Sequence, residues 1–116
     1  MKTKAVPVVK VFLAYPGGRG EPFCGPGMVK LLQKIEETGN VRQACENMKM
    51  SYSKGWKLLK ALETYLEYPA VKRRQGGKDG GAANLTEAGA AFLKKQTSFE
   101  SDCEYAIKKI FEKYYD

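Results

Sequence analysis

Two short helical patterns with only a few residues between them restrict the fold of this chain more than any other feature. The first begins after Asn40 and the second after Ser51, and both residue types readily cap helices. Apolar residues recur at helical spacing in both patterns and are expected to pack inward. They are Val41, Ala44, Cys45 and Met48 in the first pattern, and Trp56, Leu59, Leu62 and Leu66 in the second. Two helices joined by about three residues are typical of a helix-turn-helix, which we place at about residues 40–67.

The second helix of this pair has a polar and basic side opposite its apolar one. The major groove of DNA is about 12 Å wide, so it admits a helix together with its side chains. We therefore expect contacts to base edges and phosphates from this side and from the start of the preceding helix. The DNA-binding residues predicted on the two helices are Arg42, Gln43, Ser51, Tyr52, Ser53, Lys54, Lys57 and Lys60.

A glycine-rich, basic segment follows the helix-turn-helix. Val71–Gln75 and Ala82–Leu85 are predicted as two short strands joined by Gly76–Gly81, which makes a hairpin, or wing, at about residues 70–86. Glycines allow the tip to lie close to a sugar-phosphate backbone. The side chains expected to neutralise phosphates there are Lys72, Arg73, Arg74 and Lys78. A flexible surface hairpin whose charges only maintain solubility is the alternative.

The N-terminal part of the chain is expected to contribute a strand and a helix. Ala5–Tyr15 is rich in β-branched residues and is predicted as a strand, with Pro7 favouring an edge position. Pro16–Gly27 is predicted as a loop. The next apolar residues have the spacing of one helix face, and this helix is expected to stop at Gly39. They are Met28, Leu31, Leu32 and Ile35.

A long helix is predicted at the C-terminal end, where Thr86 can act as its cap. About 30 helical residues span about 45 Å, which is longer than a domain of this size needs for its own core. A second copy of the chain is the simplest partner for the far half, and a helix lying wholly across its own domain is the alternative. The predicted dimer interface consists of Phe99, Cys103, Ile107, Ile110, Phe111 and Tyr114.

These elements predict a mainly α fold with a small β-sheet (α+β). We assign residues 1–86 to a winged helix-turn-helix domain that binds DNA, and residues 87–116 to a C-terminal dimerisation helix. The N-terminal strand belongs to the first of these units.

The distribution of charge points to a polyanionic partner. The chain has a net charge of +7. Segments 41–60 and 70–85 carry net charges of +4 and +3, and together they equal the excess of the whole chain. Such a concentration is typical of a surface that binds nucleic acid, with a merely solvated face as the alternative.

Composition argues against an enzyme and against a metal or other cofactor. The chain has no histidine, which is the commonest general base and metal ligand. Its three cysteines, Cys24, Cys45 and Cys103, include no CxxC pair, so neither a disulfide framework nor a zinc site is expected. Buried packing is the interpretation we favour for them, with a thiol-based redox sensor as an alternative.

The sequence has no apolar run near the roughly 18 residues of a membrane span, and its first residues do not resemble a signal peptide. We therefore expect a cytoplasmic protein associated with the nucleoid.

The run GMVKLLQKIEETGNVRQACENMKMSYSKGWKLLKALE, continuing through VKRRQGGKDGGAANLTEAG, resembles the DNA-binding domain of ModE-type molybdate-responsive regulators, which are related to LysR-type winged helices. The most specific parts are Met50-Ser51-Tyr52 followed by Trp56, and the two double glycines before Leu85-Thr86. The resemblance implies a homodimer that binds double-stranded DNA at an operator. Because this chain ends at Asp116, it resembles the stand-alone members, and we expect no molybdate-binding domain.

Two residues depart from the pattern of that family. Lys49 stands where a glycine commonly makes the turn, and Cys45 stands where alanine is common. The function predicted from the sequence is a DNA-binding transcriptional regulator. A winged helix that binds protein or RNA, or a redox-sensing regulator, remains the alternative.

Overall fold

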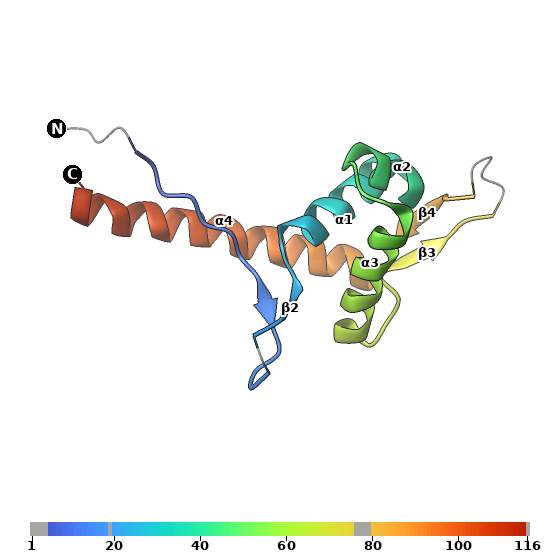
Figure 1. The fold of residues 1–116 in the computed structure, drawn as a ribbon, viewed down its shortest axis with the longest axis horizontal. Coiled ribbons are helices and arrows are strands. Elements are labelled where there is room, and N and C mark those ends of the chain that lie inside the picture. The colour runs from blue at the N-terminus through green and yellow to red at the C-terminus, as the bar shows by residue number, and fades with distance from the viewer. Residues whose placement is uncertain (1–4, 19, 76–79, 116) are drawn as a thin grey trace.

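The computed structural model describes residues 5–18, 20–75 and 80–115 (Figure 1). A compact head of three helices and short strands is joined to one long helix that projects far beyond it, so the molecule measures 58 × 33 × 24 Å. In chain order, the elements found in the described ranges are β1 (Leu13–Ala14), β2 (Pro22–Cys24), α1 (Pro26–Thr38), α2 (Val41–Asn47), α3 (Tyr52–Leu66), β3 (Val71–Arg73), β4 (Ala83–Leu85) and α4 (Glu87–Tyr115). The predicted fold class, mainly α with small sheets, is confirmed.

Helix α1 is the centre of the core and forms as its apolar spacing predicts. It starts at Pro26, where the missing proline N–H costs no hydrogen bond. It ends at Gly39, which adopts a left-handed φ of 66° and whose N–H bonds to the Ile35 carbonyl. Its buried face contacts α2, α3, α4 and β4. The core side chains from all these elements include Met28, Leu31, Leu32, Ile35, Val41, Ala44, Leu59, Leu62, Ala83, Phe92 and Leu93.

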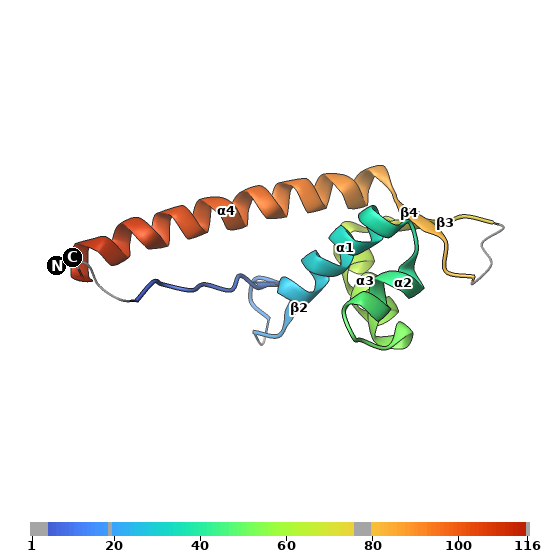
Figure 2. The same ribbon diagram turned by 90° about the horizontal axis from the view of Figure 1, so that it is seen from above.

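The N-terminal region differs from the prediction. The strand expected over Ala5–Tyr15 is reduced to Leu13–Ala14, which pairs with β2 inside the segment expected to be a loop. Residues 5–12, here called the N-terminal arm, run beside the far half of α4 instead of beside another strand (Figure 1, Figure 2). A β-prone segment becomes a strand only when another strand supplies its backbone hydrogen bonds. That partner is not among the described residues of this single chain.

The predicted wing is present, with shorter strands than expected. Strands β3 and β4 are antiparallel, with Lys72 opposite Asn84 and Arg73 opposite Ala83. Residues 76–79, which include the predicted contact Lys78, lie outside the described ranges.

Helix α4 has two halves with different surroundings. Thr86 caps it, as predicted, by accepting a hydrogen bond of 3.0 Å from the Gly89 N–H. Gly89 packs so closely on the Ala70 carbonyl that any Cβ would overlap it. Gln96 is buried and donates to Glu100 at 3.2 Å. Beyond Gln96, no described residue of α4 is fully buried, and the helix extends away from the head (Figure 2).

Candidate nucleic-acid interface

The connection between α2 and α3 is a tight turn closed by backbone hydrogen bonds. Asn40 caps α2 by accepting from the Gln43 N–H at 2.9 Å, and Ser51 caps α3 by accepting from the Lys54 N–H at 3.0 Å. Between the two helices, the Met50 N–H reaches back to the Cys45 carbonyl at 3.0 Å. Both predicted caps are therefore confirmed, and together they fix where each helix begins.

Lys49 has a backbone conformation that normally favours glycine. Its φ is 55°, in the left-handed region where a Cβ meets steric resistance. This explains why a glycine is common at this position in the family that the sequence resembles. The backbone of Lys49 is therefore strained, and its side chain adds a positive charge at the turn.

The two helices pack together through Cys45 of α2 and Gly55 of α3. Cys45 is buried, and its Sγ fills the space where a side chain on Gly55 would lie. A Cβ at position 55 would overlap that sulfur. The second departure from the family pattern, a cysteine in place of alanine, is thus accommodated by a glycine on the facing helix.

The outward side of α3 is polar and basic, as its spacing predicts. Tyr52 is half-buried, and the other residues predicted on this side are exposed. These exposed residues are Ser51, Ser53, Lys54, Lys57 and Lys60. On α2, Arg42 and Gln43 are exposed as well, so this surface continues from α3 onto the start of α2.

The wing is anchored to the start of α2. The Gly39 carbonyl accepts from the Ala83 N–H at 3.0 Å and from Nη2 of Arg74 at 2.8 Å, and the Val41 N–H donates to the Gly81 carbonyl at 2.8 Å. Gly81 has no room for a side chain, since a Cβ would lie 2.6 Å from Oδ1 of Asn40. The basic strand β3 is therefore fixed beside the helix-turn-helix. Lys72, Arg73 and Arg74 are all exposed.

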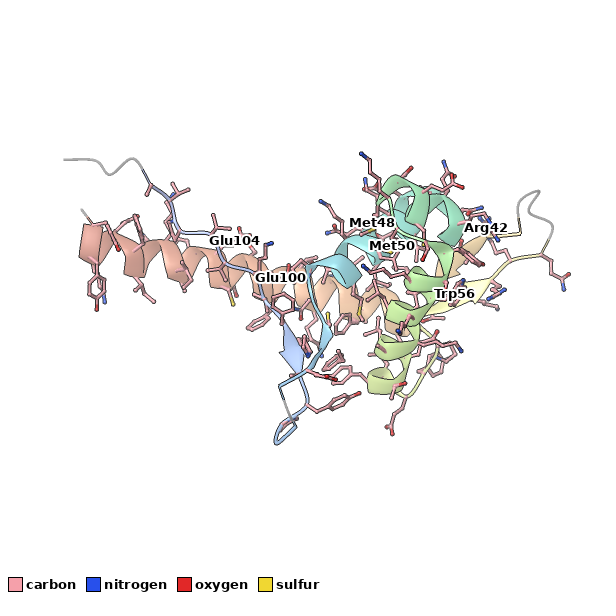
Figure 3. The ribbon with its side chains drawn as sticks, in the orientation of Figure 1. Arg42, Met48, Met50, Trp56, Glu100 and Glu104 are labelled. Atoms are coloured by element: carbon pink, nitrogen blue, oxygen red, sulfur yellow. The ribbon has the colours of Figure 1, made fainter. Side chains whose placement is uncertain are left out.

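Aromatic contacts join the wing, α3 and α2. The Arg73 guanidinium lies over the Trp56 ring, with Cζ 4.5 Å from the centroid, and Arg42 lies over Tyr52 at 4.1 Å. The two rings meet edge to face at 6.2 Å. Figure 3 shows Arg42 and Trp56 on the side from which the wing projects. Contacts among Arg42, Tyr52, Trp56 and Arg73 thus join α2, α3 and β3 at one surface.

A family model for bacterial regulatory helix-turn-helix proteins of the lysR family matches residues 27–90, which include α1, the helix-turn-helix, the wing and the start of α4. The chain belongs to this LysR-type family. This membership confirms, at the level of the family, the prediction of a DNA-binding transcriptional regulator with a winged helix-turn-helix.

Individual relatives of this LysR-type chain are ModE proteins. It is 34% identical to the transcriptional regulator ModE of Haemophilus influenzae over 73% of this chain and 33% of that protein. It is 31% identical to the DNA-binding transcriptional dual regulator ModE of Escherichia coli K12 over 62% of this chain and 28% of that protein. The chain therefore spans about a third of the length of these relatives. The predicted resemblance to ModE and LysR proteins is confirmed.

Solved structures of LysR-type proteins share the fold. The DNA-binding domain of CbnR in complex with DNA has a TM-score of 0.56 at 22% identity, over 69% of this chain and 86% of that one. CbnR itself, a LysR family transcriptional regulator, has a TM-score of 0.55 at 24% identity, over 69% of this chain and 26% of that one.

The contact between Trp56 and the wing of this family member was not predicted from the sequence. Trp56 packs against the core, as its spacing predicts, but it is only half-buried and an arginine of the wing lies over its ring. The available signal was the pair Tyr52 and Trp56, one helical turn apart, followed by a basic hairpin. The anchoring role of Gly39 and Gly81 was not predicted either.

The two buried thiols of this LysR-type domain have environments that favour a packing role. Burial, and then the charge of Glu100, raises the pKa of Cys24 to about 11. Burial also raises the pKa of Cys45, although Arg42 opposes the effect. A raised pKa reduces the thiolate fraction at neutral pH, and the thiolate is the reactive form.

Within the part of the chain that the structure describes, no cluster of His, Cys, Asp or Glu side chains is suited to a metal ion. None of the helices in the described ranges combines the length and apolar content that a membrane crossing requires.

Proposed function

We propose that this protein is a homodimer that binds duplex DNA at a two-fold symmetric site and regulates transcription from it. In this proposal α3 lies in the major groove and the wing follows the adjacent backbone. The observation that carries it is that the basic side of α3 and the basic strand β3 meet at one surface, where Arg73 stacks on Trp56. Duplex DNA fits such a surface, because its major groove admits a helix while a hairpin reaches its phosphates.

Base edges would be contacted by α3, and the DNA backbone by other elements. Ser53, Lys54 and Lys57 occupy the first turns of α3, where side chains of a recognition helix reach base edges. The wing and the start of α2 would hold the backbone. The full set of proposed DNA-binding residues is Arg42, Gln43, Ser51, Tyr52, Ser53, Lys54, Lys57, Lys60, Arg73, Arg74 and Lys78.

The far half of α4 supports a dimer. Among the described residues of the chain, its apolar side chains stay largely exposed: Phe99 is 47% exposed, Ile110 50% and Tyr114 79%. Cys103, Ile107 and Phe111 are only half-buried. A matching helix from a second copy would remove these surfaces from water, and each such side chain contributes roughly 1.5–3 kcal/mol when fully buried.

The N-terminal arm provides a second surface for the same partner. Exposure alternates along it, as in a strand, and both of its faces are largely apolar. The face with Pro7, Val9 and Val11 is half-buried, whereas Val6 and Val8 on the other face are 79% and 82% exposed. Val6, Val8 and Ile107 all line a cavity of about 380 Å³ between the arm and α4. The exposed side chains of the arm are therefore next to the proposed dimer surface of α4.

Two such chains would place two recognition helices about 34 Å apart, which is one turn of DNA. We place this function in the cytoplasm, at the nucleoid. No catalytic step is part of it, in keeping with the ModE relatives, which are named as regulators.

Duplex binding that weakens steeply with salt is the test of this function. Each neutralised phosphate contributes about −0.9 to the slope of log affinity against log salt concentration. Arg74→Ala is expected to weaken binding to all duplex sequences alike and to reduce the magnitude of that slope by about one unit. The affinity and its dependence on salt are measured by fluorescence anisotropy with labelled duplex DNA and with labelled single-stranded RNA. Equal affinity for the two nucleic acids would favour an RNA-binding module instead.

A further inference from the structure

Four side chains on the proposed DNA-binding surface form a series in which two aromatic rings lie between two cations. Arg42 of α2 lies 4.1 Å from the Tyr52 ring, Tyr52 meets Trp56 edge to face at an interplanar angle of 82°, and Arg73 of β3 lies 4.5 Å from the Trp56 ring. The two rings belong to α3. The series therefore crosses the recognition helix and connects α2 on one side with the wing on the other.

Packing, and not a hydrogen bond, sets the position of Trp56. Its Nε1–H is buried and has no acceptor among the described residues. The ring instead meets the Tyr52 ring nearly at a right angle, and the guanidinium of Arg73 lies over its face. The position of Arg73 in turn depends on this ring, because the side chain is otherwise exposed.

An arginine stacked on an aromatic ring can still bind a phosphate. The guanidinium is planar, so its face can lie on the ring while its edge presents N–H donors in a fixed fork. Such a fork pairs with two phosphate oxygens at once. The neighbouring Arg74 is held differently, by its hydrogen bond to the Gly39 carbonyl.

We propose that Trp56 is a positioning residue that orients Arg73 toward a DNA phosphate. Binding of the wing to the DNA backbone then depends on a side chain of the recognition helix. The inference rests on the proposed function, since it needs duplex DNA at this surface. Trp56 itself makes no contact with DNA in this account. Tyr52 packs against Trp56 and holds Arg42 on the other side of α3.

A comparison of single and double variants tests the proposal. Affinity for a mixed-sequence duplex is measured over a series of salt concentrations for Trp56→Leu, Arg73→Ala and the two together. Each single change is expected to weaken binding about tenfold and to reduce the magnitude of the salt slope by about one unit. Because Arg73 acts through Trp56, the double variant should bind within about threefold of either single one. Trp56→Phe retains an aromatic face and should bind within about threefold of the wild type.

Arg74→Ala is the matched control, because Arg74 is adjacent to Arg73 but does not contact Trp56. Its effect should multiply with that of Trp56→Leu, giving about a hundredfold loss. If Trp56→Leu and Arg73→Ala also multiply, the positioning role is wrong. A wild-type protein that binds no duplex at all would instead overturn the proposed function itself.

Fluorescence gives a readout that needs no DNA. Trp56 is the only tryptophan in the chain, so its emission reports the guanidinium over its ring. Arg73→Ala should shift the emission maximum, and Lys72→Ala, at an exposed position of the same strand, should leave it unchanged. Identical spectra for the wild type and Arg73→Ala would contradict the contact on which the inference depends.

Discussion

Replacing both Ile107 and Ile110 with aspartate is expected to give a folded monomer that binds a two-fold symmetric DNA site about a hundredfold more weakly than the wild type. Two linked domains gain affinity because the second binds at a high effective concentration, an effect of about 10²–10⁴. A monomer loses this gain. Since Ile110 is half exposed and Ile107 half-buried outside the core of the head, the changes should spare the fold of the head.

Sedimentation and DNA-binding measurements on the same samples check this result. The control variant carries Ser98→Asp and Ser101→Asp, which add the same charge on the opposite side of α4 by helical periodicity. Both serines are exposed, so the control should remain dimeric and bind normally. A wild-type protein that sediments as a monomer at tens of micromolar would contradict the proposed dimer.

Gly55→Ala is expected to lower the free energy of unfolding by about 2 kcal/mol, in the range measured for overpacked cores. In most helices alanine is more favourable than glycine by about 1 kcal/mol, so the expected sign is the reverse of the usual one. The reason is the overlap between the new Cβ and Sγ of the buried Cys45. Denaturant unfolding followed by circular dichroism measures the change.

A second substitution makes this prediction specific. Cys45→Ala removes the sulfur, so Gly55→Ala combined with Cys45→Ala should regain most of the lost stability. Gly27→Ala in α1 is the control, because its Cβ would have no atom within 4 Å, and it should cost nothing. If Gly55→Ala is as neutral as Gly27→Ala, the close packing of α2 on α3 is wrong.

The features that were predictable from the sequence depend on near neighbours in the chain. Asn40, Ser51 and Thr86 cap their helices because each oxygen needs only an N–H three residues further on. The buried face of α1 follows from apolar spacing alone. The wing was also predictable, because its two strands are joined by a short glycine-rich connection.

The features that were not predictable depend on contacts between distant segments. The N-terminal arm has the composition of a strand, but whether it pairs depends on which backbone lies beside it. Trp56 has apolar spacing, yet a wing arginine contacts its face. Gly39 was predicted as a helix end, but its carbonyl also anchors the wing through Arg74, 35 residues away.

Selecting bound sequences from a random duplex library, with the wild type and with Lys57→Ala, tests the central claim most directly. The claim is that α3 reads bases in the major groove, where a good side-chain contact is worth about 1–3 kcal/mol of discrimination. We expect the wild type to enrich one motif with two-fold symmetry, and Lys57→Ala to enrich a motif changed at matching positions of both halves. No enriched motif for the wild type, or the same motif for both proteins, would contradict this account of α3.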